Sequence, residues 1–153
     1  MTKTIAFILL LILLSACRIR DFTFKRSFEN GNWLYTDSLI FDFPNKDTNS
    51  LKSLYFEIQL LKEYPFRNLY LQSYTKTPKG VIFPAMPEFH FADSVGYFYV
   101  KPSRGVYQFN IPLNSDIHLN EIGNYQFVIK QFMRPDTLKG VHSIQFIIEW
   151  EEE

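Results

Sequence analysis

The chain of 153 residues has little cysteine, little glycine and no excess of either charge. Its single cysteine excludes an internal disulfide and a cysteine-rich metal site. Its six glycines form no G-x-G-x-x-G or other glycine-rich phosphate loop. Lys and Arg number 16, as do Asp and Glu, whereas a nucleic-acid-binding domain normally carries a basic excess. We therefore expect no nucleic acid among the partners of this protein.

Sequence patterns of catalysis and metal binding are also missing. The three histidines, His90, His118 and His142, show neither HExxH spacing nor a second histidine two residues away. No GxSxG motif is present to expose a nucleophilic serine. A glycosidase needs two carboxylates facing one cleft, but no sequence pattern singles out such a pair among the 16 acidic residues. We expect no catalytic residue, no metal and no cofactor, and therefore no enzyme.

The longest apolar run, Ile5 to Leu14, has ten residues. A membrane-spanning helix needs roughly 20, so the run is typical of the hydrophobic region of a signal peptide. It ends in Leu14-Ser15-Ala16-Cys17, which resembles the lipobox of bacterial lipoprotein signal peptides. We expect residues 1–16 to be a lipoprotein signal peptide. The alternative is an ordinary secretory signal followed by an accidental cysteine.

Cleavage before Cys17 predicts a mature chain held in the membrane by diacylglycerol and an N-acyl group on that cysteine. Two or more acyl chains anchor a protein stably, whereas one holds it weakly. We expect residues 17–27 to form the lipidated anchor and a short tether, and residues 28–153 to form the folded domain. Arg18, where inner-membrane retention would favour Asp, suggests the outer membrane with the domain facing the periplasm. The alternative for Arg18 and Arg20 is simple contact with anionic headgroups.

Aromatic residues make up 18% of the chain, and Phe and Tyr favour strands. No stretch beyond the signal peptide shows a convincing helical period. Apolar and polar residues alternate with a period of two, or form short apolar runs between Pro and Gly, at 39–43, 54–60, 69–72, 81–83, 89–91, 107–113, 125–130 and 144–150. About eight short strands predict an all-β fold, a single antiparallel β-sandwich that is jelly-roll-like.

The aromatic residues divide into two groups. We expect the four phenylalanines on the apolar sides of strands to be core residues; they are Phe56, Phe109, Phe127 and Phe146. Exposed tyrosine and tryptophan can stack on sugars or contact a partner protein, and Trp33 is the leading candidate. A carbohydrate-binding envelope lipoprotein is therefore an alternative function. The structural alternative is that these rings cover the second face of a sheet.

Four segments form a recognisable set. Tyr64 to Leu71 reads YPFRNLYL, and Gly123 to Arg134 reads GNYQFVIKQFMR. Asp136 to Val141 reads DTLKGV, and Phe28 to Phe43 contains a Phe…Trp…Asp series. With these four segments, most of the chain resembles the gliding-motility lipoprotein GldH family. The family usually has a D-x-x-G-x-W-L-G segment. This chain departs from it at residues 92–97, where the glycine is present but the tryptophan and the second glycine are absent.

The resemblance implies a non-enzymatic accessory of the gliding machinery of Bacteroidetes-type bacteria, whose partners are other envelope proteins. Five residues within or beside the matching segments are candidates for partner contact: Trp33, Tyr64, Arg67, Gln131 and Arg134. Each has a structural alternative. The strand phase of residues 125–131 turns Gln131 inward, and Arg134 can brace its loop through a carboxylate.

Overall fold

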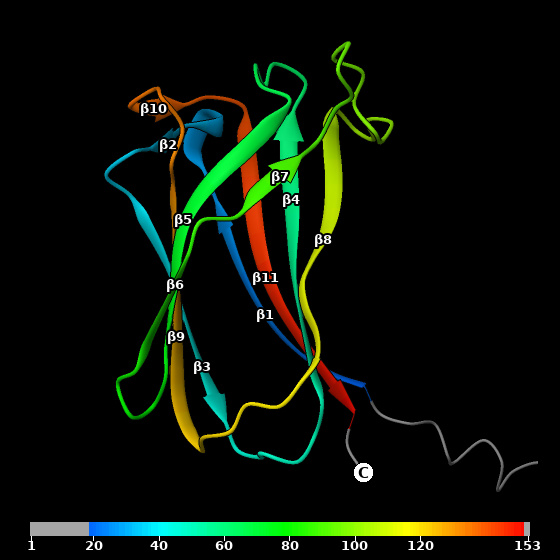
Figure 1. The fold of residues 1–153 in the computed structure, drawn as a ribbon. Helices are drawn as coiled ribbons and strands as arrows, with labels where there is room; N and C mark the ends of the chain where they lie inside the picture. The colour runs from blue at the N-terminus through cyan, green and yellow to red at the C-terminus, as the bar shows by residue number, and fades with distance from the viewer. Residues whose placement is uncertain (1–18, 152–153) are drawn as a thin grey trace, which may run out of the picture.

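The computed structural model describes residues 19–151, which form two antiparallel β-sheets packed face to face (Figure 1). The first sheet has the order β1 (Ile19–Ser27), β11 (Val141–Glu151), β4 (Lys52–Leu61) and β8 (Val106–Ile117). The second has the order β3 (Ser38–Asn45), β9 (Gly123–Gln131), β5 (Asn68–Lys76) and β6 (Ile82–Ala85), with β7 (Glu88–His90) also on β5. The predicted all-β sandwich is confirmed.

Three small elements complete the described chain. A 3₁₀ turn, η1 (Glu29–Gly31), follows β1, and β2 (Trp33–Leu34) pairs with β10 (Thr137–Leu138). Among residues 19–151, no helix is long and apolar enough to cross a membrane. The expected signal peptide, residues 1–16, and the expected lipidation site, Cys17, lie outside the described residues.

The strands follow from alternation in the sequence. In β4 the side chains of Leu54, Phe56, Ile58 and Leu60 are buried, and the residues between them are half-buried. In β3 every second residue from Leu39 onward is buried and the others are exposed. Because successive strand residues point to opposite faces, a period of two places one apolar face of each strand between the sheets.

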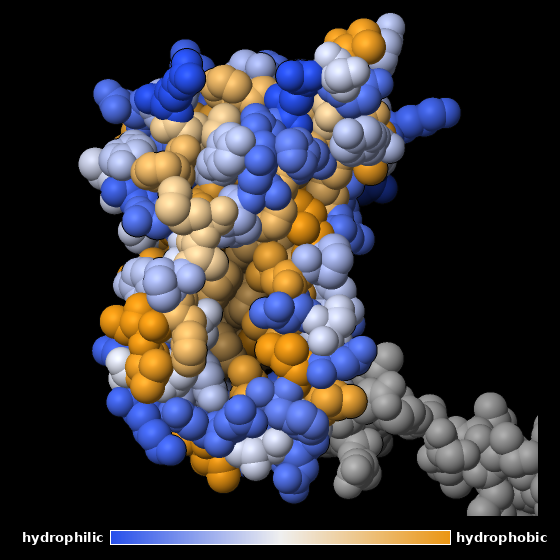
Figure 2. Space-filling view, in the orientation of Figure 1, coloured by the Kyte–Doolittle hydropathy of each residue, from blue (hydrophilic) through white to orange (hydrophobic). Residues whose placement is uncertain are grey.

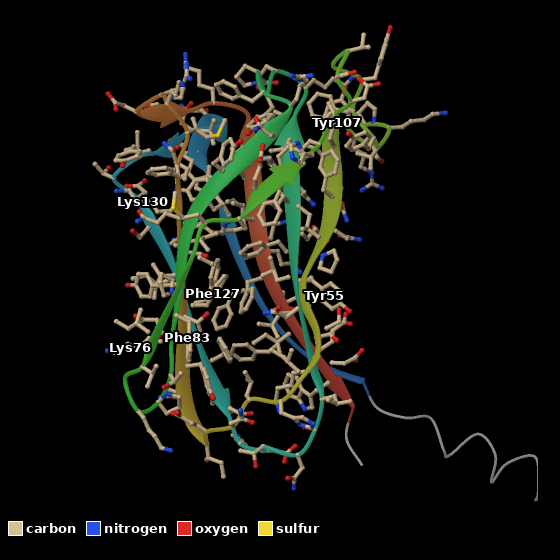
Figure 3. The ribbon with its side chains drawn as sticks, in the orientation of Figure 1. Tyr55, Lys76, Phe83, Tyr107, Phe127 and Lys130 are labelled. Atoms are coloured by element: carbon tan, nitrogen blue, oxygen red, sulfur yellow. The ribbon has the colours of Figure 1, made fainter. Side chains whose placement is uncertain are left out.

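Two rows of cross-strand neighbours cross the sandwich, and their central phenylalanines meet in the core. Cross-strand pairing lines up Phe24, Phe146, Phe56 and Ile111 in the first sheet. It lines up Phe41, Phe127, Thr75 and Phe83 in the second sheet. The ring centroids of Phe127 and Phe146 are 4.9 Å apart, and Figure 3 shows Phe127 between the sheets. The predicted core phenylalanines are therefore confirmed as parts of one cluster.

The sandwich is open along one edge. β8 ends the first sheet and β6 ends the second, and no strand among the described residues joins them. Figure 2 shows the surface hollowed along this edge, with apolar side chains in the hollow. Phe89, Phe127, Ile111 and Leu113 pack against the core there while staying partly exposed.

The beginning of the domain differs from the expected tether. Residues 19–27 form β1, in which all nine residues pair with β11. The physical reason is the alternation of Phe22 and Phe24, whose half-buried rings pack on the core while the residues around them stay exposed. The first strand of the described domain therefore begins at Ile19, two positions after Cys17.

Candidate functional site

The strand directions gather four loops at one end of the sandwich. β1 runs from Ile19 towards Ser27, and the antiparallel pairings then fix which end every other loop occupies. The end opposite Ile19, here called the distal end, consists of residues 28–37, 62–67, 91–105 and 132–140. In Figure 1 it lies at the top, and β1 begins at the bottom. The other end, the proximal end, consists of residues 46–51, 77–81 and 118–122.

Trp33, one of the predicted contact residues, is fully buried. Its ring stacks on Phe28 with centroids 5.1 Å apart, and its Nε1–H donates to the carbonyl of Asp37 at 3.0 Å. The β2–β10 pair places it there, with Leu138 opposite it in the ladder. A ring with no exposed surface cannot stack on a sugar, so this feature gives the carbohydrate-binding alternative no support.

Tyr64 and Gln131 are also buried, and both hold loops of the distal end. The Tyr64 hydroxyl donates to the carbonyl of Asn68 at 2.7 Å, and burial raises its pKa. The Gln131 side chain donates to the carbonyl of Pro135 at 3.1 Å and accepts from the N–H of Met133 at 2.8 Å. The inward orientation predicted for Gln131 is confirmed. Both buried side chains hydrogen-bond to the backbone of the distal end and hold its loops in place.

Arg67 is exposed and ties two distal loops together. Its Nη1 donates to the carbonyls of Ser94 at 2.7 Å and Asp93 at 3.3 Å. The Asp93 carboxylate in turn accepts from the backbone N–H groups of residues 95–97, at 2.8 to 2.9 Å. These hydrogen bonds, together with nearby Arg67, lower the pKa of Asp93. The loop that departs from the GldH pattern is thus a closed turn presenting an exposed Tyr97.

Arg134 is exposed as well, and it lies in the loop that Gln131 braces. Within residues 19–151, its side chain has no hydrogen bond and no ion pair. The suggested bracing of this loop by Arg134 through a carboxylate is therefore not what the structure shows. Partner contact by Arg134 and Arg67 stays a prediction.

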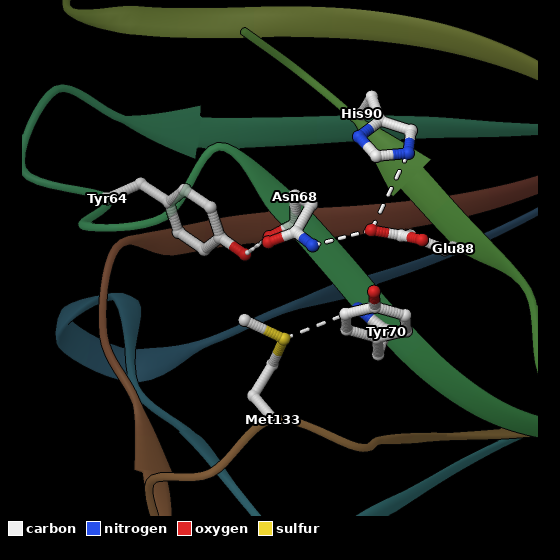
Figure 4. Close-up of polar contacts among 6 residues, drawn as sticks. All are labelled: Tyr64, Asn68, Tyr70, Glu88, His90 and Met133. Atoms are coloured by element: carbon white, nitrogen blue, oxygen red, sulfur yellow. Dashed lines mark hydrogen bonds and ion pairs between the residues drawn. The ribbon is translucent and has the colours of Figure 1, made fainter. Parts of the chain in front are cut away.

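A polar network that the sequence did not reveal centres on Glu88 (Figure 4). Asn68 donates to Glu88 at 2.6 Å, and His90 Nε2 lies 3.5 Å from the same oxygen. Hydrogen bonds from Asn68 and Tyr70 lower the pKa of Glu88, and the same contact raises the pKa of Tyr70. The network exists because β7 pairs with β5, and a strand as short as the three residues of β7 carries no sequence motif.

Two hollows adjoin this network and share Asn68. The first, of about 350 Å³, has polar walls that include Arg67, Glu88, His90 and Tyr99. The second, of about 570 Å³, has mainly apolar walls. It is lined by Phe66, Asn68, Tyr70, Met86, Phe132, Met133 and Arg134, and we call it the Tyr70 groove.

Within 19–151, no group of three or more His, Cys, Asp or Glu side chains is placed to hold a metal ion. The fold and the site together define a class of protein, an all-β sandwich domain. Its two hollows and the exposed Arg134 lie at or beside the distal end, opposite the end where β1 begins.

Sequence comparison gives the family. The chain belongs to the GldH lipoprotein family, whose model matches residues 21–148. It is 27% identical over 160 residues to the gliding motility lipoprotein GldH homolog of Christiangramia forsetii. That match covers 94% of this chain and 92% of the relative. Because the family is one of lipoproteins, membership implies a membrane-anchored protein of the cell envelope.

Solved structures resemble the chain only distantly. A carbohydrate-binding module specific for non-crystalline cellulose is 10% identical with a TM-score of 0.44, over 85% of this chain and 73% of the module. The structure of infectious bursal disease virus, Gx strain, is 14% identical with a TM-score of 0.37, over 86% of this chain and 32% of the viral chain. Likenesses this weak carry no argument about function.

Proposed function

We propose that this protein is a non-enzymatic accessory component of the bacterial gliding machinery that binds another envelope protein. Membership of the GldH lipoprotein family supports the gliding role, as does the relative from Christiangramia forsetii, a gliding motility lipoprotein GldH homolog. Diacylglycerol and an N-acyl group on Cys17 hold the chain in the membrane. The distal end contacts the partner.

One observation carries the proposal: the domain begins at one end of the sandwich, and its most elaborate loops lie at the other. β1 starts two residues after Cys17 and runs through nine residues to the distal end. At about 3.3 Å per residue, the strand spans about 30 Å. An anchor on Cys17 therefore leaves the proximal end near the membrane and turns the distal end towards other envelope proteins.

The distal end is also built to keep its shape. Arg67 joins the loop at 62–67 to that at 91–105, and Gln131 closes the loop at 132–140. Binding to preordered loops costs less conformational entropy than binding to loops that must first be ordered. A surface that needs little reordering, held at one end of the domain, suits a protein that binds a partner.

Photocrosslinking of the full-length lipidated protein in its own cells tests the proposal. Benzoylphenylalanine in place of Val95 probes the distal end, and the same residue in place of Ile122 probes the proximal end. The two positions are matched, because both are aliphatic and their side chains are 77% and 69% exposed. We expect a defined envelope protein to be captured from position 95 and not from 122. Equal capture from both positions, or no capture from position 95 or any other distal position, would contradict the proposal.

The same proposal places the protein in the outer membrane, with its domain in the periplasm. The residue after Cys17 is Arg18, where inner-membrane retention would favour Asp. Separation of inner and outer membranes on a density gradient, with immunodetection of the protein, checks the first point. Protease treatment of intact cells checks the second, because a periplasmic domain stays protected until the outer membrane is opened.

A further inference from the structure

The Tyr70 groove combines exposed apolar side chains with a single charged one. Met86, Phe132 and Tyr70 are 61%, 43% and 41% exposed, which is unusual for large apolar residues brought together on one surface. Tyr70 pairs with Glu88 in β7, and Phe132 donates its backbone N–H to the carbonyl of Tyr70 at 2.8 Å. The ring of Tyr70 on β5 and that of Phe132, the residue after β9, thus lie on hydrogen-bonded neighbouring segments at the distal border of the second sheet.

The walls of the groove are held in place by the surrounding structure. Tyr70 faces Glu88 in the β5–β7 ladder, and Asn68 donates to Glu88 at 2.6 Å. The backbone N–H of Tyr70 donates to the sulfur of Met133 at 3.3 Å (Figure 4). Met133 is itself placed by Gln131, through its backbone N–H. An apolar side chain entering the groove therefore meets walls that need little reorganisation.

Arg134 gives the groove its charge. It lines the wall and, within residues 19–151, no carboxylate or carbonyl is bonded to its guanidinium. An exposed, unpaired guanidinium is a planar set of donors that matches a carboxylate.

The loops around the groove are only slightly basic in total. The loops at 62–67, 91–105 and 132–140 contain six basic and three acidic residues, and the fourth distal loop, 28–37, adds Glu29 and Asp37, so the distal end has a net charge of +1. Arg134 is the charged residue that lines the groove itself, and its positive charge favours a carboxylate over a cation.

We propose that the Tyr70 groove binds a protein segment that presents a large apolar side chain next to a carboxylate. The apolar side chain lies against Met86 and Phe132, and the carboxylate pairs with Arg134. The inference rests on the proposed function, because it specifies which part of the distal end binds the envelope protein and what that protein must offer. Burial of the apolar walls gives affinity, and the arginine selects an acidic segment.

The test uses benzoylphenylalanine in place of Phe132 in the full-length lipidated protein in its own cells. Mass spectrometry of the crosslinked peptide identifies the segment that occupies the groove. We expect a protein segment with Asp or Glu beside a Leu, Met or aromatic residue. Crosslinking to lipid or glycan, or to a segment without acidic residues, would overturn the inference.

Two charge reversals sharpen the test. Because like charges at an interface cost several kcal/mol, Arg134→Glu lowers the crosslinking yield by about tenfold or more. Arg26→Glu is the matched control, since it makes the same change at an exposed residue of β1 outside the groove. Replacing the acidic residue of the captured segment by Lys is expected to restore crosslinking to the Arg134→Glu protein. Equal yields from the two variants would overturn the inference.

Failure of the inference can be told apart from failure of the proposed function. Capture from position 95 without capture from position 132 would leave a distal partner in place and exclude the groove. No capture from either position would contradict both. Equal thermal unfolding midpoints for the wild type and both charge variants show that the substitutions leave the domain folded, as expected for exposed side chains.

Discussion

Gly140 lies so close to Tyr64 that the two loops carrying them have no room for another atom. A Cβ added to Gly140 would be 2.6 Å from the Cα of Tyr64 and 2.8 Å from its nitrogen, and Gly140 has a φ of +83°. The Gly140 carbonyl also accepts from the N–H of Leu61 at 2.8 Å. The loop at 132–140, which carries Arg134, is therefore seated directly on the loop at 62–67.

Gly140→Ala should destabilise the domain strongly. A left-handed backbone costs about 1 kcal/mol for alanine, and the clash with Tyr64 backbone adds about 1 to 3 kcal/mol. Gly80→Ala is the matched control, because Gly80 has a similar φ of +85° and no atom within 4 Å of an added Cβ. Urea unfolding of the two variants measures the difference. Equal losses of unfolding free energy would show that the loops are not packed as described.

Gln131→Leu should cost about 2 to 4 kcal/mol of unfolding free energy, because it leaves the N–H of Met133 and the carbonyl of Pro135 without their partner. Leucine keeps the apolar volume, so the loss reports the hydrogen bonds. Gln72→Leu, on the exposed side of β5, should change stability by less than about 0.5 kcal/mol. If both variants unfold alike in urea, Gln131 does not brace the loop.

Phe146→Ala should cost about 3 to 5 kcal/mol, since it opens a cavity where the two sheets meet. The Phe146 ring lies within 6 Å of the centroids of Phe41, Phe56 and Phe127. Phe83→Ala is the matched control, because Phe83 is 59% exposed at the open edge and leaves no enclosed cavity. Thermal and urea unfolding should both show that the Phe146→Ala protein is much less stable than the Phe83→Ala protein. A reversed order would place the core elsewhere.

Asp47 should make the free energy of unfolding of the domain fall at acid pH. Hydrogen bonds from the Ser50 side chain, then from the backbone of Asn49 and Ser50, lower its pKa from 3.8 to about 2. Because the folded pKa lies below the unfolded one, this stability is present above pH 3.8 and is lost as the pH falls through about 2. Ser50→Ala removes the first of these hydrogen bonds and should raise the Asp47 pKa, measured by carboxyl ¹³C NMR. An unchanged pKa would show that Ser50 does not hold the carboxylate.

The strands of the domain could largely be predicted from alternation, and the missed ones have physical reasons. β4 shows a clear period of two in the sequence and β3 a weaker one, and the structure places both as expected. β1 contains only two well-spaced apolar positions among basic residues, so it reads as a tether until β11 supplies its partner. β2 and β10 have two residues each, which is too few for any period.

Only some residues of the candidate site could be predicted from the sequence. The motifs drew attention to Arg67 and Arg134, which are exposed, but also to Trp33, whose burial depends on the β2–β10 pair. No sequence pattern pointed to Glu88 or Met86. They lie beside Tyr70 only because the short strands β6 and β7 pair with β5. Pairing between distant segments decides which side chains share a surface, and local patterns do not record it.

The most direct test of a lipid-anchored motility component is colony spreading of a strain that lacks this gene. The strain is complemented with the wild-type chain or with Cys17→Ser, at matched protein levels confirmed by immunoblot. We predict that the wild type restores spreading and that Cys17→Ser does not, because the domain then loses its place on the membrane. Normal spreading of the deletion strain, or full rescue by Cys17→Ser, would contradict the account.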